Sequence, residues 1–113
     1  MASRLARPLT IPNEEEIDLY EVMSALTDPV RRALVRHIAA TPGGPCSTSD
    51  FGVSKSTLTR HWRVLREAGL IRQEVHGTRH RNWLRREEID RRFPGLLALV
   101  LDQPGSGPEV ADR

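Results

Sequence analysis

The stretch Val53–Ile71, VSKSTLTRHWRVLREAGLI, has the features of a single capped helix. Ser54 is a favourable helix N-cap, and Gly69 can adopt the left-handed conformation in which many helices end. Three apolar residues at helical spacing form one face, namely Leu58, Trp62 and Leu65. The opposite face carries hydroxyl and guanidinium groups, from Ser56, Thr59, Arg60 and Arg63. The stretch therefore predicts a helix over residues 55–68 with one buried and one polar face.

Two short strands are predicted directly after this helix. They cover residues 70–75 and 80–84, and His76-Gly77-Thr78-Arg79 joins them. A short connection that contains glycine favours a β-hairpin. Arginines 79 and 81 make the tip of this hairpin basic.

Two further helices are predicted on the N-terminal side. The first covers residues 14–26, with Asn13 as its N-cap and three glutamates at the positive end of its dipole. The second begins at Asp28-Pro29, an N-cap followed by proline at the first helical position. Glycines and prolines over residues 41–45 end it. Residues 46–52 are short and polar, so any helix there has about one turn.

The C-terminal side begins with a predicted helical turn over residues 86–93, which stops near Pro94-Gly95. The apolar run at residues 96–101 is compatible with a buried strand or a helix. Because Pro94 can begin a helix and no strand partner is available, a terminal helix is favoured. Residues 103–113 have the glycine and proline content of a flexible tail.

The order of these elements predicts a mainly α-helical fold with a small β-hairpin, α-α-α-α-β-β-α, which is a winged helix-turn-helix. A chain of 113 residues has material for one such domain. We expect an N-terminal arm at residues 1–13, the domain itself at residues 14–102 and a tail at residues 103–113.

The charge is concentrated in one part of the chain. Residues 54–86 carry nine basic and two acidic side chains, a net charge of +7, whereas both flanking segments are net acidic and the whole chain has only +2. This asymmetry favours a polyanionic partner that meets one face of the protein. The alternative is a solvated helix face that the acidic flanks balance.

Several classes of protein are disfavoured by the sequence. It has no glycine-rich phosphate loop, no paired carboxylates in an apolar setting and no nucleophile elbow, so we expect no enzymatic activity. It has no apolar run of about 20 residues and no secretory signal, so we expect no membrane segment. The single cysteine, Cys46, fits a reducing, cytoplasmic setting, either as a buried filler or as a thiol switch.

The polar face of the helix at residues 55–68 has the chemistry needed to read DNA. Arginine can bind guanine with two hydrogen bonds in the major groove, and hydroxyl groups can contact bases or phosphates. Lys55 lies at the helix N-terminus, where a phosphate is favoured. Arg79 and Arg81 of the hairpin can reach the adjacent backbone or the minor groove.

Two motifs also resemble the ArsR family of transcriptional regulators. The segment Ala25–Leu34, ALTDPVRRAL, is similar to that family's L-x-D-P-T-R-R-x-I-L motif. The segment Val53–Ile71 is similar to its recognition-helix motif S-x-S-T-x-S-x-H-L-x-x-L-x-x-A-G-L-(V/I). The resemblance covers roughly residues 16–102.

The resemblance implies a homodimer that binds double-stranded operator DNA. It places six residues at positions that read DNA, namely Ser54, Ser56, Thr57, Thr59, Arg60 and His61. It also implies a dimer interface made by the first and last helices. The apolar faces of those helices agree with this, and we expect Ile17, Tyr20, Leu96, Leu97 and Val100 in the interface.

The sequence departs from the family where many members bind metals. Where those members have two cysteines, this chain has Cys46 alone, and residues 87–102 contain no histidine. His61, His76 and His80 are expected on the DNA-facing side, and His37 on a helix surface or at an interface. Because a soft or borderline metal needs three or four thiolate or imidazole ligands, we expect no metal site and no cofactor.

These observations predict a sequence-specific DNA-binding transcriptional regulator, a repressor that acts as a homodimer. The main alternative is a winged-helix module that binds a protein or an RNA, since the same fold serves several functions. A protein-binding module would more often present an apolar patch where this chain has its net charge of +7.

Overall fold

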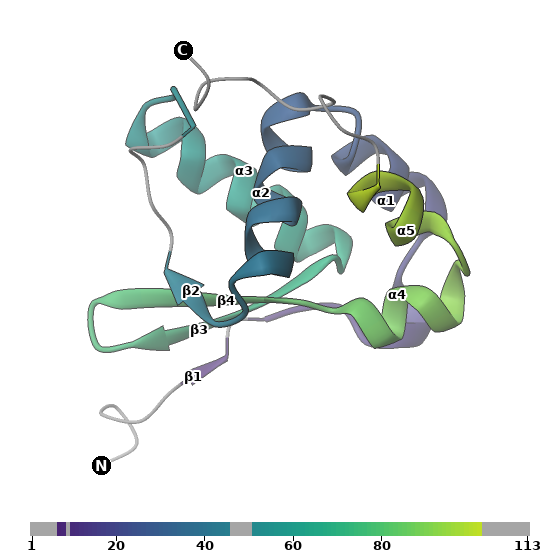
Figure 1. The fold of residues 1–113 in the computed structure, drawn as a ribbon. Helices are drawn as coiled ribbons and strands as arrows, with labels where there is room; N and C mark the ends of the chain where they lie inside the picture. The colour runs from purple at the N-terminus through teal and green to yellow at the C-terminus, as the bar shows by residue number, and fades with distance from the viewer. Residues whose placement is uncertain (1–6, 9, 46–50, 103–113) are drawn as a thin grey trace.

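The computed structural model describes residues 7–8, 10–45 and 51–102 (Figure 1). Its elements, in chain order, are β1 (Arg7–Pro8), the 3-10 helix η2 (Glu14–Glu16), α1 (Leu19–Ala25), α2 (Pro29–Ala40), β2 (Gly44–Pro45), α3 (Lys55–Ala68), β3 (Ile71–His76), β4 (Arg79–Leu84), α4 (Arg86–Arg92) and α5 (Leu96–Leu101). The helices after α1 and the hairpin β3–β4 confirm the predicted winged helix-turn-helix.

Helix α3 has the predicted ends and the predicted buried face. The Ser54 hydroxyl accepts a hydrogen bond from the Thr57 amide at 3.2 Å, and Gly69 adopts φ +92° after the last turn. Leu58, Trp62 and Leu65 are buried, as expected from their spacing. The local sequence of this segment therefore specifies its helix without help from the rest of the chain.

The sheet is larger than predicted. Strands β3 and β4 form an antiparallel hairpin with a two-residue turn, in which Gly77 adopts φ +66°. Strand β1 adds to β3 and strand β2 adds to β4, which gives the order β1-β3-β4-β2. The two outer strands have two residues each, too few for an alternating pattern to reveal them in the sequence.

The predicted helix over residues 14–26 is wrong, because the segment is divided in two. Asn13 caps only the 3-10 turn η2, and the carboxylate of Asp18 caps α1 by accepting from the Glu21 amide at 3.0 Å. Between them, Ile17 is extended and only 2% exposed. An extended residue at this point lets the Ile17 side chain enter the core, which a continuous surface helix would not allow.

Helix α2 begins as predicted, since the Asp28 carboxylate accepts from the amides of Val30 and Arg31 at 2.8 and 3.3 Å. The predicted short helix over residues 46–52 lies mostly outside the described residues. Its last two residues form bends instead of a helix, and Phe51 is a buried anchor, in edge-to-face contact with His37.

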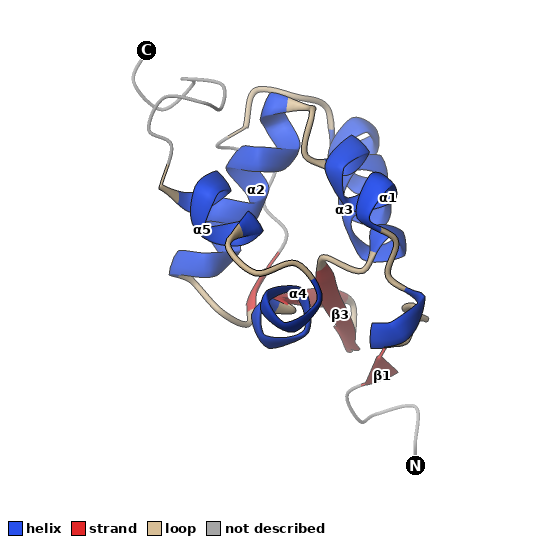
Figure 2. Ribbon diagram, turned by 90° about the vertical axis from the view of Figure 1, so that its right-hand side faces the viewer, coloured by secondary structure: helices blue, strands red, loops and turns tan. Residues whose placement is uncertain are grey.

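The C-terminal run at residues 96–101 is a helix, as favoured over a strand. Gly95, with φ +90°, is the residue before its first turn, so Pro94 does not begin the helix as expected. Leu97 is completely buried beneath α5, whereas Leu99 is 63% exposed. Helices α1, α2, α3 and α5 lie on one side of the sheet, and α4 continues from the end of β4 (Figures 1 and 2).

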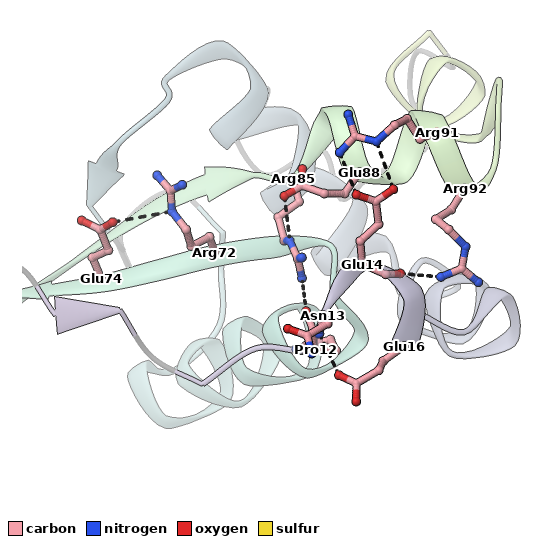
Figure 3. Close-up of polar contacts among 10 residues, drawn as sticks. All are labelled: Pro12, Asn13, Glu14, Glu16, Arg72, Glu74, Arg85, Glu88, Arg91 and Arg92. Atoms are coloured by element: carbon pink, nitrogen blue, oxygen red, sulfur yellow. Dashed lines mark hydrogen bonds and ion pairs between the residues drawn. The ribbon is translucent and has the colours of Figure 1, made fainter.

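Arginines of α4 and its N-cap hold the segment that precedes α1 (Figure 3). Arg91 binds both carboxylate oxygens of Glu14, at 2.7 and 3.0 Å, and Arg92 donates to the Glu14 carbonyl. Arg85, which is 7% exposed, donates to the Pro12 carbonyl at 2.8 Å. The Arg91 guanidinium lowers the pKa of the Glu14 carboxyl by its hydrogen bonds. These contacts dock residues 12–16 against the C-terminal part of the domain.

Candidate nucleic-acid interface

The outer face of α3 is polar and exposed, as the helical spacing predicts. Its exposed residues are Lys55, Ser56, Thr59, Arg60 and Arg63. They leave the opposite face to the core, so the helix is presented lengthwise at the surface of the domain. Hydroxyl and guanidinium groups on one exposed helix face can contact base edges in a major groove.

The hydroxyl groups at the beginning of α3 form a capping cluster. The Ser54 hydroxyl donates to the Thr57 hydroxyl at 2.9 Å and lies 3.3 Å from the Ser56 hydroxyl. Thr57 is half-buried. Ser54 and Thr57 therefore have a structural task at the helix N-terminus, whereas the exposed Ser56 can face outward as well.

The wing, which we define as the hairpin β3–β4, projects beside α3 (Figure 1). Arg79 and His80 follow its glycine turn and are exposed. Arg81 is also exposed, and its guanidinium donates to the Gly43 carbonyl at 3.3 Å, which holds it along the sheet. The tip of the wing therefore presents cationic or protonatable groups to the solvent.

On the outer side of the wing, two contacts order the side chains. The Arg72 guanidinium lies 4.6 Å from the centroid of the Trp83 ring, a cation–π contact. Glu74 lies 3.6 Å from Arg72 and 3.1 Å from the His76 ring nitrogen (Figure 3 shows the first of these). His76 and Arg72 are thereby committed to Glu74.

A groove of about 530 Å³ separates α3 from the wing. Its lining residues are Lys55, Thr59, Trp62, Arg63, Arg66, Gln73, Thr78, Arg79 and His80. Four of these lining residues are cations and none is a carboxylate. The groove joins the exposed face of α3 to the tip of the wing in one electropositive surface.

His61 does not lie on this surface, which corrects its expected position. Its side chain is 5% exposed, and its Nδ1 atom accepts from the Arg31 guanidinium at 3.1 Å. Arg31 also donates to the Ala25 carbonyl at 2.6 Å, so one arginine joins α1, α2 and α3. Burial lowers the pKa of His61, as do the nearby Arg31 and Arg60, and the Asp28 carboxylate only partly opposes this.

We expect the stability of the domain to fall in mildly acidic solution because of His61. A lowered pKa in the folded state means that the unfolded chain binds the proton more readily. The contribution is therefore complete above the ordinary value of 6.5 and is lost as the pH falls through the folded pKa. Urea denaturation of the wild type and of His61→Asn, whose amide oxygen can still accept from Arg31, measures it. Identical pH dependence in the two proteins would show that His61 is not responsible.

A chain of buried hydrogen bonds beneath the groove was not predicted from the sequence. Arg66 donates to the Gln73 side-chain oxygen at 2.8 Å, and the Gln73 amide donates to the Asn82 oxygen at 2.6 Å. The Asn82 amide in turn donates to the Gly44 carbonyl at 3.2 Å. Gln73 alternates with Ile71 along β3, so strand periodicity already placed it on the inner face.

The expected interface residues divide into buried and exposed sets. Ile17 and Leu97 are buried in the domain core, and Leu96 and Val100 are half-buried. Tyr20 is 75% exposed. Two residues outside the expected set, Met23 and Leu99, are also large, apolar and exposed.

Within the described residues, no group of three or more histidine, cysteine or acidic side chains is arranged to hold a metal ion. Cys46 lies outside these residues. In the same part of the chain, the helices are all too short or too polar to cross a bilayer.

The helices and the wing together define a winged helix-turn-helix protein. Residues 26–74 match the model of a family described as a helix-turn-helix domain. The match begins just before α2, contains the whole of α3 and ends within β3. No curated protein is similar enough to the chain to count as a relative. The helix-turn-helix domain supports assignment of the chain as a DNA-binding regulator, a class that is typically not enzymatic.

Proposed function

We propose that this protein is a cytoplasmic transcriptional repressor of the ArsR type that binds operator DNA as a homodimer. The observation that carries the proposal is the continuous cationic surface formed by α3, the groove and the wing. Its groove is lined by Lys55, Arg63, Arg66 and Arg79 without a carboxylate. A surface of this kind, on a winged helix-turn-helix, suits a nucleic-acid backbone.

Within this proposal, α3 reads bases and the wing grips the backbone. Ser56, Thr59 and Arg60 are exposed along α3, where a helix in the major groove would meet base edges. Arg79 is exposed at the end of the wing, where it can reach a phosphate or the minor groove. The assignment to the ArsR type and to repression rests on the two sequence motifs.

An electrophoretic-mobility titration tests the function directly. The wild-type protein is titrated onto duplex DNA from upstream of its own gene, at several salt concentrations, with random duplex and single-stranded RNA as competitors. We expect tight binding to the upstream duplex, weaker binding to random duplex, and affinity that falls steeply with salt. Equal or better binding to RNA, or no binding to any nucleic acid, would favour the alternative interaction module.

The homodimer is proposed from the exposed apolar residues of α1 and α5. Tyr20, Met23 and Leu99 are exposed although each is large and apolar. A second subunit related by a twofold axis would cover the same residues on both chains. A domain with so small a core would also gain stability from such an interface.

We expect Leu99→Glu to produce monomers without unfolding the domain. Leu99 is 63% exposed, so a charge there is tolerated by the isolated subunit but is costly inside an interface. Sedimentation at micromolar concentration reports the assembly, and circular dichroism reports the fold. Glu88→Gln, on α4 and away from the exposed apolar residues, is the control and should leave the assembly unchanged. A wild-type protein that sediments as a monomer would contradict the proposal.

A further inference from the structure

We propose that the groove between α3 and the wing binds one phosphate of the DNA backbone, and that Arg66 is the side chain positioned to hold it. This inference rests on the proposed function and names a contact that neither the exposed face of α3 nor the tip of the wing supplies. Arg66 lines the groove together with Lys55, Arg63 and Arg79.

The charge of the groove selects the chemistry of its ligand. Four of its lining residues carry positive charge, and the others are hydroxyl, amide, imidazole or indole groups. With no carboxylate among them, a cation or a neutral apolar ligand gains little there. An anion would lower the mutual repulsion of the four cations and accept their hydrogen bonds.

Arg66 is already held in place by the buried chain of hydrogen bonds. One of its guanidinium nitrogens donates to Gln73, which is 1% exposed, and Gln73 donates to Asn82, which is completely buried. The chain ends at the Gly44 carbonyl, whose backbone pairs with β4. Since each amide has its donor and acceptor sides assigned by this chain, Gln73 presents its oxygen to Arg66. An arginine fixed in this way loses less conformational entropy when it binds a phosphate.

The groove also has buried donors that lack acceptors. The indole nitrogen of Trp62 and the Nε atom of Arg66 have no hydrogen-bond partner among the described residues. Trp62 itself is only 3% exposed. Buried donors without partners are uncommon in folded proteins, and they often mark a functional site. An excess of donors over acceptors is what an oxyanion would complete.

The position of the groove favours a backbone phosphate over a free anion. Lys55, Thr59 and Arg63 belong both to the lining of the groove and to the exposed face of α3. If α3 enters a major groove, the strand that borders this groove must pass beside the helix. The space between α3 and the wing is where that strand would lie.

The test combines protein variants with methylphosphonate DNA, in which one phosphate at a time is made neutral. For the wild type, we expect one position in each half-site to weaken binding about tenfold. Arg66→Met should weaken binding to unmodified DNA to a similar extent and make that position insensitive. Arg66→Lys keeps the charge without the planar fork, and should lose part of the effect if Arg66→Met does not fold.

Gln73→Leu tests whether Arg66 needs to be positioned. We expect it to weaken binding severalfold and to reduce the effect of the same methylphosphonate, although all cations remain. Arg72→Met is the matched control, because Arg72 lies on the outer side of the wing and does not line the groove. It should leave the methylphosphonate profile unchanged.

The outcomes separate this inference from the proposed function. Normal DNA binding, with the same methylphosphonate profile in the wild type and Arg66→Met, would overturn the inference and leave the function intact. Failure of the wild type to bind DNA would overturn the proposed function and with it the backbone contact. Inorganic phosphate is titrated with tryptophan fluorescence as the signal. Saturable binding that requires Arg66, without a methylphosphonate effect, would replace the backbone contact by a free-anion site.

Discussion

Gly69→Ala is expected to lower the free energy of unfolding by about 2–4 kcal/mol. Gly69 has φ +92°, a conformation that costs an L-residue about 1–2 kcal/mol. A Cβ atom there would also lie 2.7 Å from the Cγ1 atom of Ile17 and 3.2 Å from Pro12. Both neighbours belong to the segment docked against α4, so they cannot move without breaking other contacts. Urea denaturation at equal protein concentrations measures the loss.

Gly95→Ala is the matched control for Gly69→Ala. Gly95 has nearly the same backbone angle, φ +90°, but a Cβ atom there would have no heavy atom within 4 Å. We expect this variant to lose only the conformational part, about 1–2 kcal/mol. In the background Ile17→Ala, which removes the clashing atoms, Gly69→Ala should also cost less than it does alone. Equal losses for Gly69→Ala and Gly95→Ala would show that the contact with Ile17 has no energetic importance.

Features set by neighbouring residues were predictable from the sequence. Ser54 and Gly69 mark the ends of α3 by their own chemistry, and Asp28 with Pro29 marks the start of α2. The glycine at position 77 likewise indicated the turn of the wing. In each case the signal and the structure lie within a few residues of each other, so no long-range contact is needed to decide between alternatives.

Features that depend on distant residues were not predictable in this way. His61 lies on α3 next to the exposed Arg60, yet Arg31, thirty positions earlier, holds it in a buried site. Ile17 looked like part of a continuous helix, but its place in the core against Gly69 requires an extended backbone. Tertiary packing overrides local preference at both positions.

The contacts of α3 also explain how this helix is held at a fixed angle to the rest of the domain. Arg31 joins it to α1 and α2 through His61, Ile17 packs on its C-terminal glycine, and Arg66 ties it to the sheet. These contacts are distributed from the middle of the helix to its end. A base-reading helix benefits from this rigidity, because hydrogen bonds to base edges require side chains placed to within a fraction of an ångström.

Arg60→Ala is expected to reduce discrimination between the operator and a mismatched site by about 1–3 kcal/mol per half-site. The proposed dimer uses Arg60 twice, so the ratio of specific to random affinity should fall by a factor of roughly 100 or more. Arg60 is exposed on α3 and belongs to the face proposed to enter the major groove. Titrations with operator, single-substitution operators and random duplex measure the ratio. The loss should concentrate at one base pair in each half-site.

Arg79→Ala should behave differently, because Arg79 lies on the wing and is proposed to meet the backbone. We expect it to weaken operator and random duplex alike, and to make the slope of log affinity against log salt shallower by about 0.9 for each phosphate that a subunit no longer neutralises. Arg86→Ala removes the same charge from α4, where Arg86 is exposed and lies 3.8 Å from Asp90. This control should change neither the ratio nor the slope appreciably. If all three variants weaken binding equally and without sequence preference, net charge alone explains the affinity and α3 does not read bases.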